Sequence, residues 1–297
     1  MFEQVTPTVR YAKAPTAIGV ATRGDDALLI DTGLDENLVR KVVNALANEG
    51  KTVRAIVNTH AHADHIGGNA FAVKRTGARV VAPHYEHFFV ERPDLEPWTL
   101  FGAAAPHALS GKFLQAQPSR VDHAVVGEGT QDVAGFQLAF RSLPGHSVHQ
   151  MGVEVDGVLF VGDAVLPPDV LSKYGLVFAV DPIAARASTE RLLQLAPPHV
   201  VAYHGGYVHD LAGAVRANAE AMREAEETLL RALARGPAGE DDLHAALLDR
   251  FPATARSVEL HALHRATVRG YLSALERAGR VEALLDGSRL LWRLREK

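Results

Sequence analysis

Short β-branched and apolar runs alternate along the first 210 residues with segments whose apolar side chains recur at helical spacing. This alternation predicts a mixed α/β domain. Two of the runs are separated only by Asp156-Gly157, a dipeptide typical of two-residue hairpin turns. The predicted strands cover residues 16–22, 27–31, 53–57, 80–82, 121–126, 137–143, 151–155, 158–161 and 200–203, and the predicted helices cover residues 35–48, 71–75 and 184–195.

The segment from residue 91 to about 120 breaks this pattern. Prolines recur through it, and aromatic side chains such as Trp98 and Phe113 are set among small residues. An irregular segment of this length inside a compact domain is usually functional. We expect a lid or a wall of the substrate site, although a structural cap suits the same composition nearly as well.

From residue 211 onward the chain reads as mainly helical, so we expect two domains, residues 1–210 and 211–297. Helices are predicted over 211–234, 239–250 and 260–278, the second one ended by Phe251-Pro252. Two strands at 280–285 and 288–294 flank Asp286-Gly287 and predict a hairpin. Helices followed by such a hairpin resemble a winged helix-turn-helix domain.

Composition narrows the class of protein. The chain has 297 residues, of which 47% are hydrophobic, and it has no cysteine, so any metal must be held by nitrogen and oxygen ligands. A formal net charge of −4 gives no global attraction to nucleic acid or anionic lipid. The sequence contains neither an apolar run long enough to span a membrane nor a leader-like start. We expect a cytoplasmic protein without membrane contact.

One cluster of ligand-type residues dominates the sequence. His60, His62, Asp64 and His65 lie within six positions and are separated only by alanines. Imidazole nitrogens and carboxylate oxygens bind Zn²⁺ and similar divalent ions. Residues at i and i+2 cannot share one face of a helix, so the cluster is predicted to form a loop that follows the strand at 53–57.

Three later positions repeat one arrangement, a strand-like run followed by His or Asp next to glycine. They are His146, Asp163 and His204. Each alone is weak, but together with the first cluster they supply the ligands that two ions need. His60, His62 and His146 could hold one ion and Asp64, His65 and His204 the other, with Asp163 bridging the two.

The motif from Thr59 to Gly68, together with the order of the later ligands, resembles the metallo-β-lactamase superfamily of metallohydrolases. The resemblance covers residues from about 16 to 210. It implies an αββα sandwich, followed here by the small helical, winged-helix-like domain, and a dinuclear site at one edge of the sheets. Zn²⁺ is the expected metal, with Fe or Mn²⁺ as alternatives.

Two positions refine the resemblance. Lactam-cleaving members generally lack a bridging aspartate at the position of Asp163, so β-lactamase activity is not expected. Glyoxalase II-like members often carry a further histidine at the position of Gln150, and we interpret the adjacent His149 as structural.

The expected reaction is hydrolysis by a hydroxide shared between two ions, with Asp64 as the catalytic residue that orients it or accepts its proton. The first hypothesis is a hydrolase of a small ester, thioester or lactone. The alternative is a phosphodiesterase or endoribonuclease acting on RNA, favoured by the winged-helix resemblance and by ten basic against five acidic residues from Arg250 onward. An iron-dependent persulfide dioxygenase and a DNA-binding regulator are less favoured. The C-terminal domain is expected to pack on the catalytic domain, wall the pocket or form a homodimer.

Overall fold

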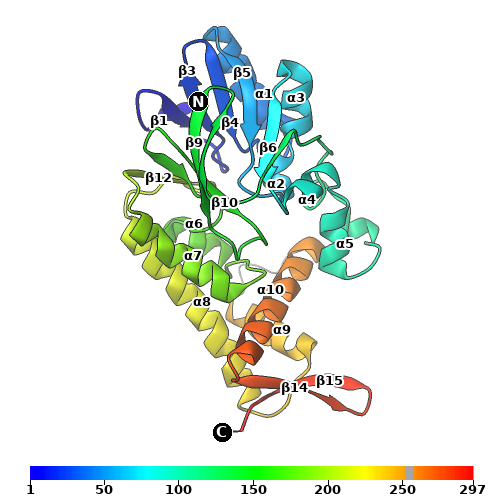
Figure 1. The fold of residues 1–297 in the computed structure, drawn as a ribbon. Helices are drawn as coiled ribbons and strands as arrows, with labels where there is room; N and C mark the ends of the chain where they lie inside the picture. The colour runs from blue at the N-terminus through cyan, green and yellow to red at the C-terminus, as the bar shows by residue number, and fades with distance from the viewer. Residues whose placement is uncertain (252–256, 297) are drawn as a thin grey trace.

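The computed structural model describes residues 1–251 and 257–296. Two β-sheets pack face to face, helices cover their outer faces, and a helical C-terminal region extends below them (Figure 1). The seven-stranded sheet has the order β1-β2-β3-β4-β5-β6-β7, with bounds Phe2–Gln4, Val9–Ala12, Gly19–Arg23, Asp26–Ile30, Thr52–Val57, Arg79–Pro83 and His123–Val125. The six-stranded sheet has the order β13-β12-β11-β10-β9-β8, with bounds Gly206–Tyr207, His199–Ala202, Val158–Phe160, Met151–Val155, Phe136–Ser142 and Gly129–Val133.

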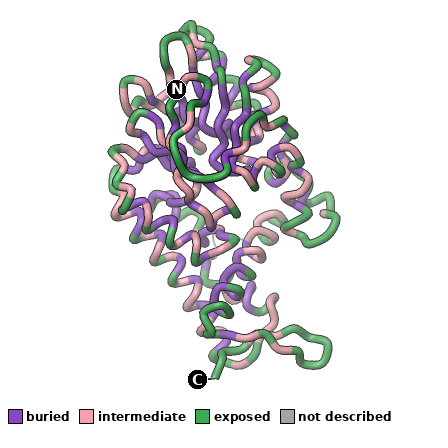
Figure 2. The backbone as a smooth tube through the Cα atoms, in the orientation of Figure 1, coloured by how far each residue is buried: buried purple, intermediate pink, exposed green. Residues whose placement is uncertain are grey.

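Strand side chains alternate between two buried environments, which is why most strands read as continuous apolar runs. In β4, Leu28 and Ile30 point into the core between the sheets, whereas Leu29 packs outward against α1 (Glu36–Asn48). In β11, Phe160 faces the same central core and Leu159 packs on the opposite side. Burial is therefore densest along the sheets (Figure 2). The αββα sandwich predicted from the sequence is confirmed.

The helices of the sandwich divide between its two faces. The seven-stranded sheet is covered by α1 and α3 (Asn69–Thr76), and the six-stranded sheet by α7 (Pro182–Leu195) and the first half of α8 (Leu211–Leu233). The Asp156-Gly157 hairpin is present, and both residues have positive φ, as the tight two-residue turn requires. The strands β1, β2, β8 and β13 and the helix α6 (Pro168–Tyr174) were not predicted from the sequence.

The segment 91–120 is less irregular than we predicted. It contains α5 (Leu95–Phe101) and a short 3₁₀ helix, η1 (His107–Leu109), and α4 (His87–Glu91) precedes it. Pro97 lies in the first turn of α5, where a backbone N–H has no partner within the helix, so proline is tolerated there. The prediction of a structureless segment was therefore wrong for these residues.

The C-terminal region is built from α8, α9 (Glu240–Arg250), α10 (Val258–Arg277) and the hairpin β14 (Val281–Asp286) and β15 (Arg289–Leu294). Its own apolar core joins Leu229, Leu243, Val268 and Leu272. Because α8 contributes to this core and to the outer layer of the sandwich, it connects the two parts. The boundary at residue 210 stays a prediction, the winged-helix detail is not confirmed, and Pro252 lies outside the described residues.

The helix α10 reaches back to the sandwich. It packs against α5 and η1 and also against α7 (Figure 1). Among the helices of the described ranges, none has both the length and the apolar character needed to cross a bilayer.

Gly67 lets the chain pass close to another backbone segment. A Cβ at this position would lie 2.0 Å from the carbonyl oxygen of Leu34, and Gly67 ends α2 (Ala63–Ile66), the helix that carries Asp64 and His65. We expect Gly67→Ala to lower the free energy of unfolding by at least about 1–3 kcal/mol, because backbone atoms must move apart.

Thermal unfolding measures this effect. Gly111→Ala is the matched control, because no atom lies within 4 Å of a Cβ built there. Equal melting temperatures for the two variants would contradict the close approach at Gly67.

Candidate metal centre

All seven sequence-predicted ligands converge at one edge of the sandwich, where strands end. His60 and His62 follow β5 in the predicted loop, but Asp64 and His65 lie on the short helix α2, so the prediction of a loop was wrong for these two residues. The loop after β9 carries His146, the loop after β11 carries Asp163, and the loop after β12 carries His204. Asp64 and His204, which are 140 positions apart in the sequence, thus lie 3.3 Å from each other.

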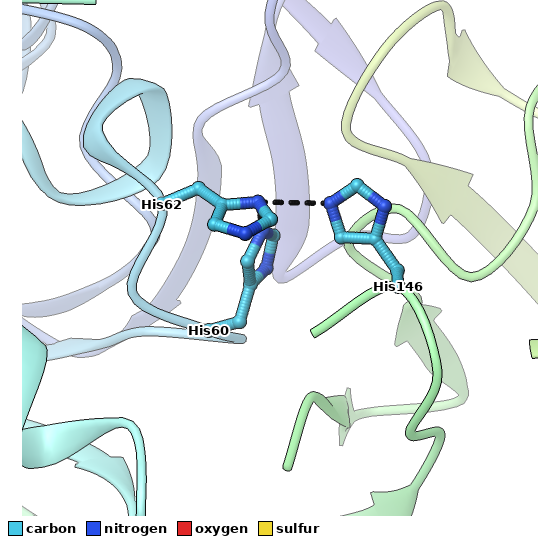
Figure 3. A group of neighbouring side chains, drawn as sticks. All are labelled: His60, His62 and His146. Atoms are coloured by element: carbon cyan, nitrogen blue, oxygen red, sulfur yellow. Dashed lines mark hydrogen bonds between the residues drawn. The ribbon is translucent and has the colours of Figure 1, made fainter. Parts of the chain in front are cut away.

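The first cluster consists of three imidazoles whose nitrogens point toward one another (Figure 3). His62 Nδ1 lies 3.0 Å from His60 Nε2 and 2.9 Å from His146 Nε2. The opposite nitrogen of His146, Nδ1, donates to the carbonyl oxygen of Phe178 at 3.2 Å. Its Nε2 therefore presents a lone pair to the other two rings.

Thr59 fixes the orientation of His60 in the same way. The Thr59 hydroxyl donates to Asp31 Oδ2 at 2.8 Å, so it accepts from His60 Nδ1, 3.1 Å away. The other nitrogen of His60, Nε2, then also carries a lone pair. Two lone pairs thus converge on His62 Nδ1, and three imidazole nitrogens this close together form the kind of cluster that could hold a metal ion.

The second cluster contains Asp64, His65 and His204, and Asp163 lies between it and the first. His65 Nδ1 donates to Asp31 Oδ2 at 2.8 Å, so the lone pair of Nε2 becomes available to a cation when the ring gives up its second proton. His65 Nε2 lies 3.5 Å from Asp163 Oδ2, and both this nitrogen and Asp163 Oδ1 are buried without a hydrogen-bond partner in the described structure. Buried acceptors without donors are costly unless a cation satisfies them.

The spacing of these atoms fits a divalent ion. Asp163 Oδ2 lies 3.4 Å from His146 Nε2 and 3.5 Å from His204 Nε2, and His204 Nε2 lies 3.3 Å from Asp64 Oδ2. A tetrahedral ion with bonds of about 2.0–2.1 Å holds its ligand atoms about 3.3 Å apart. The residues present therefore fit the metal that the sequence predicts.

The histidines of the two clusters differ in the direction in which their pKa values are shifted. Burial and the adjacent His146 lower the pKa of His62 to about 3, and burial also lowers the pKa of His60 and His146. In the second cluster, burial opposes charge, but Asp31 and Asp163 outweigh it and raise the pKa of His65 well above its usual value. The first cluster thus offers neutral imidazoles, whereas the second attracts positive charge.

Asp64 and Asp163 are ionised at neutral pH. Burial favours their neutral forms, yet His65 and His204 outweigh it and lower the pKa of Asp64 to about 2 and that of Asp163 further. Tyr203 supports this arrangement, because its ring stacks on His65 at 3.6 Å and its hydroxyl donates to the carbonyl oxygen of Asp64.

A cavity of about 520 Å³ opens directly on the two clusters. His62, Asp64, His146, Asp163 and His204 form its polar floor. Its other walls are mostly apolar and come from three regions far apart in sequence: Phe113 and Leu114, then Leu166 and 176–178 around α6, then Leu260 and Leu263 of α10. The segment 91–120 and the C-terminal helix thus both line the cavity, in line with the wall role expected for each.

Sequence comparison gives the family of the chain. The profile of the metallo-beta-lactamase superfamily matches residues 13–206, about two thirds of the sequence. The chain belongs to this superfamily.

Individual members of the superfamily resemble the chain at modest identity. The hydroxyacylglutathione hydrolase of Methylobacillus flagellatus is 29% identical over 171 residues, which are 57% of this chain and 53% of that protein. The chain thus spans about half the length of that relative. A probable metallo-hydrolase of Bacillus subtilis is 29% identical over 187 residues, covering 61% of this chain and 80% of the other.

Solved structures share the fold along almost the whole chain. A metallo-beta-lactamase family protein from Thermus thermophilus superposes with a TM-score of 0.75 at 23% identity, covering 98% of this chain and 99% of its own. A beta-lactamase domain protein from Burkholderia ambifaria gives a TM-score of 0.76 at 18% identity, covering 99% and 93%. The C-terminal helical region therefore belongs to an arrangement that other members of the fold also have.

Several residues of this superfamily site were not found from the sequence. Asp31 follows β4 as the ligands follow their strands, so the same signal could have identified it. Glu86 had no such signal. It accepts from the backbone N–H groups of Ala61 and His149 and from the Ser147 hydroxyl, and so connects the loop of His60 to the loop of His146. His149 contributes this backbone contact, in keeping with the structural role expected for it.

Glu96 is the other carboxyl that the sequence did not single out. It lines the cavity, and its Oε1 lies 3.7 Å from His62 Nε2. Burial, with the charges of Glu86 and Asp64, raises the pKa of Glu96 to about 8. The group that faces the outer nitrogen of His62 is therefore mostly a neutral carboxylic acid at pH 7 in the metal-free protein.

Asp31 provides a test of ligand positioning. Its two oxygens accept from the Thr59 N–H, the Thr59 hydroxyl and His65 Nδ1, each at 2.8 Å. Asp31→Asn keeps the shape and tolerates the positive φ of 58°, but its amide cannot accept at both positions. We expect zinc affinity to fall by about 10–100-fold.

Competition with a chromogenic chelator measures that affinity. Asp26→Asn, at the start of the strand that Asp31 follows, is the control because the Asp26 side chain pairs with Arg54 at the surface. An Asp31→Asn protein that binds zinc as tightly as the Asp26→Asn protein would refute the positioning role.

Proposed function

We propose that the protein is a metal-dependent hydrolase of a small ester, thioester or lactone. The observation that carries the proposal is the mostly apolar cavity beside the ligand clusters, whose size is typical of small-molecule sites. The names of the hydroxyacylglutathione hydrolases among the relatives, which describe cleavage of a thioester, favour a thioester within this class.

In this proposal the clusters hold two divalent ions, with zinc the favoured metal. His60, His62 and His146 hold one ion, Asp64, His65 and His204 hold the other, and Asp163 contributes to both. When bound, such ions supply Lewis acidity for the substrate carbonyl and lower the pKa of water.

The side chains of the protein have separate roles in the reaction. The Asp64 carboxylate, ionised and on the cavity floor, accepts a hydrogen bond or a proton from the attacking water. His204 and Tyr203 hold Asp64 in place. The apolar walls exclude bulk water from the remainder of the substrate, which strengthens every electrostatic contact at the floor.

The alternative, cleavage of RNA, is less well supported by the C-terminal region. Of the basic residues on which it depended, Arg256 and Lys297 lie outside the described residues. Arg265 and Arg269 share Glu240, at 2.5 and 2.9 Å, and Arg265 also lies 3.3 Å from Asp241, so both arginines are held in ion pairs within the protein. Further pairs join Arg250 to Glu224, Arg277 to Asp181, Arg280 to Glu226 and Arg293 to Glu282. Phosphate binding needs cationic groups that are free to replace counterions.

We expect His62→Ala and Asp163→Ala each to abolish thioester and lactone hydrolysis together with metal loading, because each removes a ligand from a cluster. Elemental analysis and a spectrophotometric assay with a thioester and lactone panel measure the two effects. A chelator should remove the activity of the wild type, and zinc should restore it.

The control is His123→Ala, which removes an exposed histidine side chain that lies outside the two clusters and hydrogen-bonds to Gln131. A metal-loaded, active Asp163→Ala protein would exclude Asp163 as a ligand, and a metal-loaded wild type without activity on the whole panel would exclude the proposed substrate class.

Single-stranded RNA provides the opposing test. We expect no cleavage by the zinc-loaded protein and no salt-dependent binding in fluorescence anisotropy, since the ion pairs above leave few free cations on α10. Cleavage that is lost as salt rises would favour the nuclease alternative.

A further inference from the structure

His264 is an almost fully buried imidazole on the cavity wall to which the proposed reaction gives no role. It lies in α10, only 5% of it is exposed, and it lines the same cavity as His62 and His204. Its Nδ1 is buried without a hydrogen-bond partner. Within residues 1–251 and 257–296, no protein group hydrogen-bonds to its Nε2 either.

Such a ring is costly to keep in an apolar wall. Burying a hydrogen-bonding group without a partner destabilises the folded state, so native proteins satisfy nearly all of them. Leu260 and Leu263 lie beside His264 on the same helix and line the cavity with it. Nδ1 is enclosed by protein, but Nε2 also has no hydrogen-bond partner in the described structure, and a molecule that fills the cavity could supply one.

The ring is neutral at pH 7. Burial, followed by the neighbouring His244 and His261, lowers the pKa of His264 to about 4, so it carries a single N–H. Because protein encloses Nδ1, Nε2 is the nitrogen left to meet a ligand. In the described structure His264 makes no hydrogen bond or ring contact with the seven metal-ligand candidates. The substrate atom that His264 would bind is therefore a different atom from the carbonyl that reacts at the metal centre.

We propose that His264 Nε2 donates a hydrogen bond to an acceptor oxygen on the substrate, separate from the carbonyl that is hydrolysed. This inference rests on the proposed function, because it takes the cavity as the substrate site. The substrate class becomes an ester or thioester with an apolar middle section and a second carbonyl, amide or carboxylate oxygen. His264 would then be a specificity-determining residue, supplied by the C-terminal region to a site whose chemistry lies in the sandwich.

Binding of two non-hydrolysable probes tests this without requiring catalysis. The probes are thioethers of equal length, one ending in a primary amide and the other in an isopropyl group of similar shape. Isothermal titration with the zinc-loaded wild type should give a preference of about 10-fold for the amide probe, the effect of one hydrogen bond. His264→Leu should remove that preference, and His264→Gln, which retains an N–H donor, should recover part of it.

His261→Leu is the matched control. His261 lies on the same helix and stacks on His244 at 4.4 Å, but it does not line the cavity. We expect its preference to equal that of the wild type, with unchanged zinc content in all variants.

Three results would overturn the inference: a preference that survives in His264→Leu, an equal loss of affinity for both probes in that variant, or binding of neither probe by the wild type. Hydrolysis of the matching thioesters by the wild type is measured separately. If the wild type prefers the amide probe but does not hydrolyse the thioesters, the proposed function is wrong, whereas the role of His264 in binding is retained.

Discussion

Five buried or half-buried imidazoles and two carboxylates meet at one edge of the sandwich, and the charges and lone pairs that they bring together constrain the surrounding structure. Ionisable groups lose hydration when they are buried, so each must find a partner or a cation. Asp31 and Thr59 determine which nitrogens of His60 and His65 face inward, and Phe178 does the same for His146. The remaining acceptors face one another, and a divalent ion is the partner that satisfies them together.

Backbone geometry allows this convergence. The loops that carry the ligands approach other segments so closely that only glycine fits at certain points. A Cβ at Gly145, the residue before His146, would lie 2.0 Å from the backbone nitrogen of Ala185, and its φ of 119° is one that other residues rarely adopt. The sandwich core holds the strand ends rigidly, and the loops need little freedom of their own. A site built in this way is preorganised, which is the property that metal-assisted hydrolysis requires.

The C-terminal region contributes to the wall of the cavity beside the metal-ligand clusters. Many of its arginines, among them Arg265, Arg269 and Arg280, pair with carboxylates of the same chain, which leaves fewer of them free to bind a phosphate backbone. Its helix α10 packs against α5 and places two leucines and His264 on the cavity wall. The cavity wall and the metal-ligand clusters therefore come partly from different regions of the chain.

The sequence alone predicted the candidate ligands and most strands of a mixed α/β domain, because both depend on local patterns, and the family resemblance added the sandwich. Strands buried on two faces appear as apolar runs, and a metal loop appears as histidines spaced by alanines. The sequence could not reveal α5, where a proline in the first turn does no harm, or the roles of Asp31, Glu86 and Glu96. It also could not show that Arg265 and Arg269 are paired or that His264 reaches the cavity. Those properties depend on which distant segments the packed core brings within a few ångströms, and that proximity is decided only by the tertiary structure.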